Sequence, residues 1–272
     1  MTHFQIHAAD GFTLHGTLHD AQSDRVLLVA SAMGVKRRYY DAFAQFLAKN
    51  GITTVTFDYR GIGDSRPASL RKFGGSMVDW GKLDIPAAID WISRELRPKT
   101  LSYAGHSAGG QLAGLAPNVE RVSRFVFVSA QSGYWRHWPG LRSFGLGALW
   151  LAMPLISRAV GYFPSKPLGL GSEELPREVA SQWARFGRHP EYLFGYVDPA
   201  PYARVTAPIL AWSFSGDRYA PRPAVEALLL HYSAAPVTRR HVENDAVGHF
   251  DFFRRGKVEE LWSETVEWLS TR

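Results

Sequence analysis

One short segment predicts the architecture of the whole chain: Tyr103-Ala-Gly-His-Ser-Ala-Gly-Gly110. Residues 99–103 are a short β-forming run and residues 111–115 are a run of small helix-compatible residues, so the segment indicates a strand, a tight turn and a helix. Gly105 and Gly109 flank Ser107 as a nucleophile elbow requires, because a side chain at either flank would collide with the neighbouring strand or helix. We therefore expect Ser107 at the carboxyl edge of a sheet, with the Ala108 amide directed toward an oxyanion formed on an attacked carbonyl.

Strands and helices alternate on both sides of this turn. Apolar runs predict strands at residues 25–30, 52–57, 125–128, 208–214 and 236–242. Helical spacing of apolar residues predicts helices at about 39–49, 76–96, 223–232 and 258–268. Residues 3–8 and 12–19 alternate polar and apolar around Asp10-Gly11, which predicts an N-terminal hairpin with a two-residue turn. The order indicates an α/β fold, with a mostly parallel central sheet flanked by helices.

Residues 131–205 interrupt this alternation with a long aromatic segment that has no strand pattern. We predict a core formed by residues 1–130 and 206–272, and a helical cap, or lid, formed by residues 131–205. Because the segment follows the strand after the elbow, it would lie over Ser107. Trp135, Trp138 and Trp150 are the candidate substrate-binding residues of the cap, although aromatic residues can also fill a subdomain's own core.

Composition excludes several classes of protein. The chain of 272 residues has no cysteine, which rules out disulfides and thiolate catalysis. Its net charge is +6, but the basic residues are scattered among acids, which argues against a nucleic-acid partner. Residues 1–7 have neither the charged nor the apolar part of a secretory signal, so we expect a cytoplasmic protein.

Two further patterns carry little functional weight. The longest apolar run, residues 144–156, contains Pro154 and is shorter than the roughly 20 residues that cross a bilayer, so we expect no transmembrane segment. The histidines at 3, 7, 15 and 19 lack a compact ligand spacing. We expect no metal and no other cofactor. In the loop after residue 57, Asp58 and Arg60 are expected to fix a structural turn, since the Gly-x-Gly there lacks the rest of a nucleotide-binding motif.

Five motifs together give the chain a family resemblance. They are residues 31–40 after the strand at 25–30, residues 57–65, the elbow at 105–109, Gly216-Asp217 and Gly248-His249-Phe250. With these motifs the chain resembles the α/β-hydrolase superfamily, and within it the branch of monoacylglycerol lipases, serine aminopeptidases and predicted hydrolases. The resemblance implies the α/β-hydrolase fold. It also implies a catalytic triad: Ser107 as nucleophile, His249 as general base and acid, and Asp217 as the carboxylate that orients the imidazole.

The alternatives to this triad lie close to His249 in the sequence. Asp245 and Asp251 are competing acids, but they are so near His249 that reaching back to its ring is awkward. His106, next to the serine, is expected to be structural because its side chain points elsewhere on the turn. The oxyanion hole would use the backbone amides of Met33 and Ala108, although Ser31-Ala32 stands where the family commonly has a His-Gly pair.

The resemblance implies a serine hydrolase that cleaves a carboxylic ester, or a related acyl bond, of a small to medium apolar substrate through an acyl-enzyme. The same triad serves amidases or aminopeptidases, thioesterases and acyltransferases, which differ in leaving group and acceptor. A ligand-binding receptor on a hydrolase scaffold is the alternative from another class, and a complete triad argues against it. Serine as the nucleophile argues against dehalogenase and epoxide hydrolase chemistry, which use aspartate there.

Overall fold

The computed structural model describes residues 1–167 and 172–271. Within these residues, eight strands form one sheet in the order β1-β2-β4-β3-β5-β6-β9-β10. The strands are β1 Thr2–His7, β2 Thr13–His19, β3 Arg25–Ala30, β4 Thr53–Phe57, β5 Thr100–His106, β6 Arg124–Val128, β9 Ile209–Phe214 and β10 Val237–Val242. β2 is antiparallel to β1 and β4, and all later pairings are parallel. The prediction of a mostly parallel central sheet is therefore confirmed.

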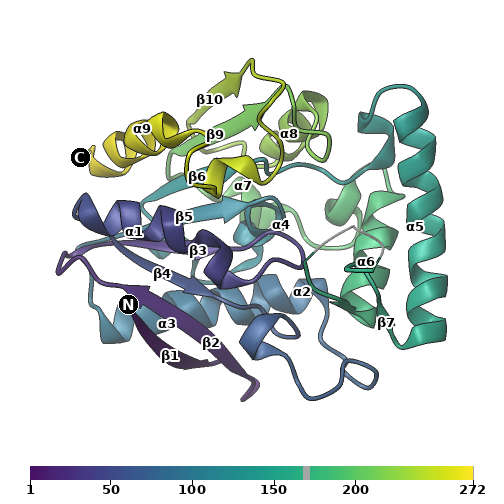
Figure 1. Cartoon of the computed structure of the whole chain (residues 1–272), viewed down its shortest axis with the longest axis horizontal. Helices are drawn as coiled ribbons and strands as arrows, with labels where there is room; N and C mark the ends of the chain where they lie inside the picture. The colour runs from purple at the N-terminus through teal and green to yellow at the C-terminus, as the bar shows by residue number, and fades with distance from the viewer. Residues whose placement is uncertain (168–171, 272) are drawn as a thin grey trace.

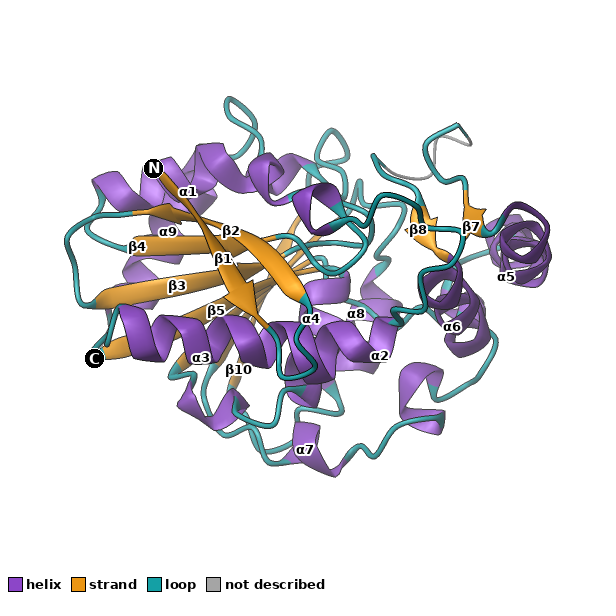
Figure 2. Ribbon diagram, turned by 90° about the horizontal axis from the view of Figure 1, so that it is seen from below, coloured by secondary structure: helices purple, strands orange, loops and turns teal. Residues whose placement is uncertain are grey.

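Helices cover both faces of this sheet (Figure 2). The helices are α1 Asp41–Lys49, α2 Met77–Asp79, α3 Ile85–Glu95, α4 Ala108–Leu112, α5 Leu141–Val160, α6 Arg177–Gly187, α7 Ala200–Ala203, α8 Arg222–Leu229 and α9 Glu259–Ser270. α1 and α9 bury Phe43 and Trp262 in a core on one face. α3, α4 and α8 bury apolar residues in the core on the other face.

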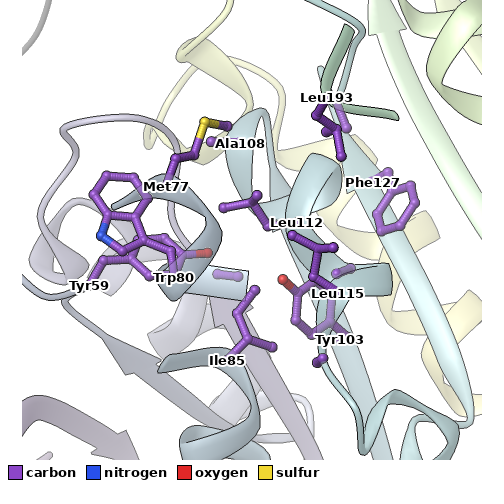
Figure 3. Packing of buried hydrophobic residues seen from close by; sticks show 14 of the residues in the cluster. Tyr59, Met77, Trp80, Ile85, Tyr103, Ala108, Leu112, Leu115, Phe127 and Leu193 are labelled. Carbon is purple, nitrogen blue, oxygen red and sulfur yellow. The ribbon is translucent and has the colours of Figure 1, made fainter. Parts of the chain in front are cut away.

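The second core holds the helix that follows the serine turn. Figure 3 shows Ala108 and Leu112 of α4 between Met77 and Trp80 on one side and Phe127 of β6 on the other. Trp80 stacks on Tyr59 with ring centroids 4.6 Å apart, and all of these side chains are fully buried. The turn before α4 is thus anchored by close packing on both sides, which limits how far Ser107 can move.

The parallel register aligns the carboxyl ends of five strands at one edge. Ala30 of β3 pairs with Gly105 of β5, and Val128 of β6 pairs with both His106 and Trp212. Phe214 of β9 pairs with Val242 of β10. The loops after these strands therefore converge where the chain changes direction between β3 and β5, the place at which open α/β sheets bind ligands.

Three local predictions differ from the structure. The hairpin turn between β1 and β2 is longer than predicted, because Ala8 donates to the Phe12 carbonyl at 2.9 Å and leaves three residues in the loop. The predicted helix at 76–96 is divided into α2, a π-helical stretch at Trp80–Asp84, and α3. Two short strands that we did not predict, β7 Tyr162–Phe163 and β8 Leu175–Pro176, pair antiparallel inside the aromatic segment.

Residues 131–205 carry α5, α6 and α7, and Figure 1 shows α5 at one end of the molecule with α6 between it and the sheet. The sequence argument against a membrane span was wrong about length, since α5 has 20 residues and continues through Pro154. By length and composition alone, α5 could cross a membrane. Its inner side is nevertheless buried within the protein at Ser143, Trp150, Met153 and Ser157.

Candidate active site

Ser107 lies between β5 and α4 in an unusual backbone conformation. Its φ is 50° and its ψ is −111°, a region that costs a residue with a side chain on the order of 1–3 kcal/mol. The Ser107 amide donates to the Val128 carbonyl at 2.9 Å, which ties the turn to the neighbouring strand β6. The predicted strand, tight turn and helix are present, and the strained turn presents the serine side chain at the carboxyl edge of the sheet.

The two flanking glycines are required by close backbone approach. A Cβ on Gly105 would come within 2.5 Å of the Gly110 nitrogen. A Cβ on Gly109 would overlap the carbonyl oxygen of Ala30 in β3. Real Cβ atoms do not approach so closely, so the expected steric reason for glycine at both flanks is confirmed.

Asp217 and His249 form a buried hydrogen-bonded pair. Asp217 follows β9 and His249 follows β10, and the Nδ1 of His249 lies 2.8 Å from Oδ2 of Asp217. The Oδ1 of Asp217 accepts from the Tyr219 and Ala220 amides at 2.8 and 3.0 Å. Burial by itself would raise the pKa of Asp217, but His249 and the Tyr219 amide outweigh it and hold this pKa below its usual value. Asp217 is therefore ionised at neutral pH and fixes the Nδ1–H tautomer of His249.

The two competing acids do not reach the imidazole among the described residues. Asp251 instead accepts from the Gly248 amide, with its Oδ2 at 2.8 Å. The main-chain carbonyl of Asp245 packs so closely against Gly216 that a Cβ on this glycine would clash with it. Of the three candidate carboxylates, only Asp217 contacts His249 in the described part of the chain.

The Ser107 hydroxyl faces the same cavity as His249 but donates to another group. Its Oγ lies 3.4 Å from Oε1 of Gln131, which is longer than a good O–H···O hydrogen bond. No hydrogen bond joins Ser107 to His249 in residues 1–167 and 172–271. In unliganded enzymes such bonds are often long and tighten when substrate binds. The triad role of Ser107, Asp217 and His249 remains a prediction that this geometry allows.

The amides predicted for the oxyanion hole lie in loops at the same edge. Met33 follows β3 and lines the cavity, and Ala108 is the first residue of α4, at the positive end of the helix. Among the described residues, neither amide donates to a backbone or side-chain acceptor. Although Ser31-Ala32 stands in place of the family's His-Gly pair, the loop after β3 is anchored, because the Ala32 amide donates to the Tyr40 hydroxyl at 2.8 Å. The use of both amides stays a prediction.

His106 connects the loop after β3 to the loop that contains His249. Its Nε2 lies 2.9 Å from the His249 carbonyl, so Nε2 carries the proton and donates. Its Nδ1 then accepts from the Tyr40 hydroxyl, at 2.9 Å. Burial lowers the pKa of His106 to about 3, so its ring is neutral at neutral pH. The side chain points away from the cavity and positions His249, which agrees with the structural role expected from the sequence.

Two glutamines form a chain of hydrogen bonds beside the serine. Gln131, the residue at the start of the aromatic segment, donates from Nε2 to the Tyr219 carbonyl at 3.1 Å. Gln111 donates to Oε1 of Gln131 at 3.3 Å and accepts from the Tyr192 hydroxyl at 2.9 Å. Sequence reasoning missed Gln131, although its position just after β6, at the edge where the active-site loops converge, was a usable signal.

The cavity between the sheet edge and α5 is small and mainly apolar. Its volume is about 100 Å³. The polar groups on its wall include Ser107, Gln131 and His249, and its apolar wall includes Leu146, Leu149, Trp150, Met153, Phe163, Leu175 and Trp183. Of the predicted cap residues, Trp138 and Trp150 line it, whereas Trp135 does not. Trp135 packs outside the cavity, against Phe144 and the Arg136 guanidinium.

Trp183, Tyr219 and Phe250 also line the cavity and were not predicted as site residues. Trp183 lies on α6 and contacts the Trp150 ring edge-to-face, with centroids 4.8 Å apart. Helical spacing cannot say which aromatic residue of a segment faces a cavity before the packing of its helices is known. Phe250 adjoins His249 in the sequence, and Tyr219 follows Asp217 by two residues, so both were within reach of the motif argument.

Comparisons with known proteins agree with this architecture. A family model described as the alpha/beta hydrolase family matches residues 13–261. An esterase from Exiguobacterium antarcticum is similar in structure, with a TM-score of 0.65 and 16% identity over 98% of this chain and 99% of that one. The esterase Est1E from Butyrivibrio proteoclasticus, solved with ferulic acid, has a TM-score of 0.61 and 16% identity over 98% and 97%. No curated protein matches the sequence.

Proposed function

We propose, from the premise that this chain belongs to the alpha/beta hydrolase family, that it is a serine hydrolase acting on carboxylic esters. One observation carries the proposal: His249, hydrogen-bonded to the buried Asp217, lines the same mainly apolar cavity as a serine on a strained strand–helix turn. A serine hydroxyl is a poor nucleophile unless a neighbouring base takes its proton and a third group holds that base in one tautomer.

In the proposed reaction, Oγ of Ser107 attacks the ester carbonyl while Nε2 of His249 takes the hydroxyl proton. Asp217 accepts from Nδ1–H and stabilises the imidazolium that forms. The Met33 and Ala108 amides would donate to the oxyanion of the tetrahedral intermediate. His249 then gives its proton to the leaving alcohol, and an acyl-enzyme remains on Ser107. A water molecule, deprotonated by His249, attacks the acyl-enzyme, and the acid is released as Oγ recovers its proton.

The cavity suits a small or medium apolar acyl group, because its volume is about 100 Å³ and its wall is mainly apolar. Side chains of α5 and Trp183 of α6 form part of this wall. We propose that residues 131–205 set this preference as a cap over Ser107. Each methylene that fits contributes up to about 0.8 kcal/mol, equivalent to about a fourfold gain in kcat/KM. Amides, thioesters and acyl transfer would use the same machinery, and cleavage of amides or thioesters is an outcome of the test.

The test is kinetics on p-nitrophenyl esters from acetate to palmitate, beside aminoacyl p-nitroanilides and acyl thioesters. We expect kcat/KM on the esters to rise with chain length and then fall abruptly. Trp183→Ala should move the fall to longer chains because it removes a cavity wall, whereas the control Trp135→Ala should leave it in place. A flat profile would contradict selection by the cap, and turnover confined to anilides or thioesters would contradict the ester assignment.

A further inference from the structure

The outer side of α5 is a continuous apolar stripe. Leu141, Phe144, Leu151 and Leu155 are 87%, 66%, 60% and 69% exposed. Positions 141, 144, 148, 151 and 155 follow the three- and four-residue spacing that puts side chains on one side of a helix, and Ala148 fills the middle position. The opposite side of α5 is buried or lines the cavity. Large side chains exposed along a whole helix indicate an interaction surface rather than scattered exposure.

Basic side chains lie beside the stripe, and its neighbourhood in the sequence contains no acidic residues. The sequence has no aspartate or glutamate from residue 121 to residue 172. Arg158 lies seven residues after Leu151, so it extends the stripe at its C-terminal end, and Arg142 lies near its start. In the part of the chain that the structure describes, no carboxylate lies within ion-pair distance of either arginine. This surface would therefore attract anions.

A basic groove opens between α5 and α6, next to the stripe. It has a volume of about 440 Å³, and its lining includes Arg158, Arg177, Glu178, Arg185 and Arg188. Glu178 pairs with Arg177 at 3.1 Å, which leaves Arg158, Arg185 and Arg188 as excess positive charge. The Arg185 guanidinium packs over the Tyr196 ring, 4.7 Å from its centre. Guanidinium groups gathered in this way suit phosphate oxygens.

We propose that α5 and this groove dock the protein on the surface of an anionic lipid bilayer. The apolar stripe would lie among the acyl chains, while Arg158 and Arg188 would contact lipid phosphates at the same depth as the headgroups. α5 stands at one end of the molecule, with α6 between it and the sheet, so a flat surface can reach the whole stripe (Figure 1).

The charges beside the stripe favour an anionic bilayer over a second copy of the chain as the partner. Two stripes paired antiparallel would bring Arg142 of one protomer near Arg158 of its partner, and parallel stripes would bring like arginines together. The stripe offers no acid to compensate either arrangement. A spanning helix is also disfavoured, because withdrawing α5 into a bilayer would strip the cavity of Leu146, Leu149, Trp150 and Met153.

The same helix thus lies between the bilayer and the serine cavity. Its outer side would rest in lipid, and its inner side supplies part of the cavity wall next to Ser107. Apolar substrates dissolved in the membrane would then be concentrated within one helix diameter of the site, which α-helical geometry sets at about 10 Å.

The test is co-sedimentation of the full chain with phosphatidylcholine vesicles and with vesicles containing phosphatidylglycerol, at low and high salt. We expect binding to the anionic vesicles only, weakened by salt. Leu151→Gln with Leu155→Gln should weaken binding at least tenfold, and so should Arg158→Gln with Arg188→Gln. Matched controls are Leu230→Gln, which changes an exposed leucine at the end of α8, outside the stripe, and Arg255→Gln with Lys257→Gln, which removes the same charge. Circular dichroism melts check that every variant folds.

Vesicle binding needs no turnover, so Ser107→Ala should bind as the unaltered protein does, and the docking surface is tested separately from the chemistry. Four results would overturn the proposal. The first is no binding to anionic vesicles, and the second is equal loss in the matched controls. The third is a dimer, detected by analytical ultracentrifugation, that the Leu151 and Leu155 changes dissociate. The fourth is binding that resists carbonate extraction, which would indicate a span.

Discussion

Asp217 is distinguished from the other candidate acids by its contacts with the His249 ring. We expect Asp217→Asn to lower kcat by about 10⁴-fold, because an amide in its place favours the wrong tautomer of the histidine. Asp251→Asn should cost less than about tenfold, since Asp251 contacts only the loop amide of Gly248 near the site. Esterase kinetics on both variants test the assignment, and the reverse order of effects would show that Asp251 is the acid.

His106 gives the protein a pH-dependent stability that can be measured. Its pKa is about 3 in the folded protein and near 6.5 when unfolded, so the unfolded chain binds more protons below pH 6.5. Stability is therefore lost as pH falls through this window. Between pH 7 and pH 5 the loss from this residue is about 2 kcal/mol.

The measurement is urea unfolding of the unaltered protein and of His106→Gln at both pH values. Glutamine keeps an N–H donor for the His249 carbonyl but does not titrate. On acidification, the free energy of unfolding of the variant should therefore fall by about 2 kcal/mol less than that of the unaltered protein. Equal pH dependence in the two proteins would mean that His106 does not carry the effect.

Residue-level chemistry was predictable where one motif fixes one backbone geometry. Gly105, Ser107 and Gly109 define the strained turn by themselves, because only glycine fits beside β3 and α4. Gln131 was missed because its role depends on Gln111 and Tyr192, which are 20 and 81 residues apart from their respective partners, Gln131 and Gln111. Its position just after β6 was a usable signal for the site, but no local sequence pattern indicates such a three-dimensional chain of contacts.

The junction of β3 and α4 sets the position of the serine at the scale of elements. Gly109→Ala should destabilise the protein by about 3 kcal/mol and impair turnover, because the new methyl must push the Ala30 carbonyl or the helix away. The control is Gly145→Ala on α5, where a Cβ meets nothing within 4 Å. This exposed helical site should gain about 0.5–1 kcal/mol. Denaturant unfolding measures both, and a Gly109→Ala protein of unchanged stability would refute the steric account.

Element boundaries were predictable where an apolar pattern ended at a turn, as at β9 and α1. Prediction failed at Pro154, which lacks an amide donor for an internal helix bond and yet lies inside α5. Burial of Trp150 and Met153 before the proline, and of Ser157 after it, holds the helix in place on both sides of Pro154. β7 and β8 were missed because strands of two residues have no detectable periodicity.

At the scale of the whole molecule, the alternating pattern was enough for the sheet, since every predicted parallel strand found its place in it. The aromatic segment was less predictable. Trp135 and Trp150 are the same residue type in the same segment, so composition cannot distinguish them, but Trp150 lines the cavity and Trp135 packs outside it. Which face of α5 turns inward is decided by its contacts with α6, and those contacts involve residues roughly 30 positions away in the sequence.

The claim on which this account rests is that Ser107 is an activated nucleophile. The direct measurement is reaction of the folded protein with a fluorophosphonate, followed by intact mass and peptide mapping. We predict a single adduct on the peptide that contains Ser107, no adduct in Ser107→Ala, and much slower labelling in His249→Ala. An adduct on another residue, or none on a protein shown to be folded, would contradict the account.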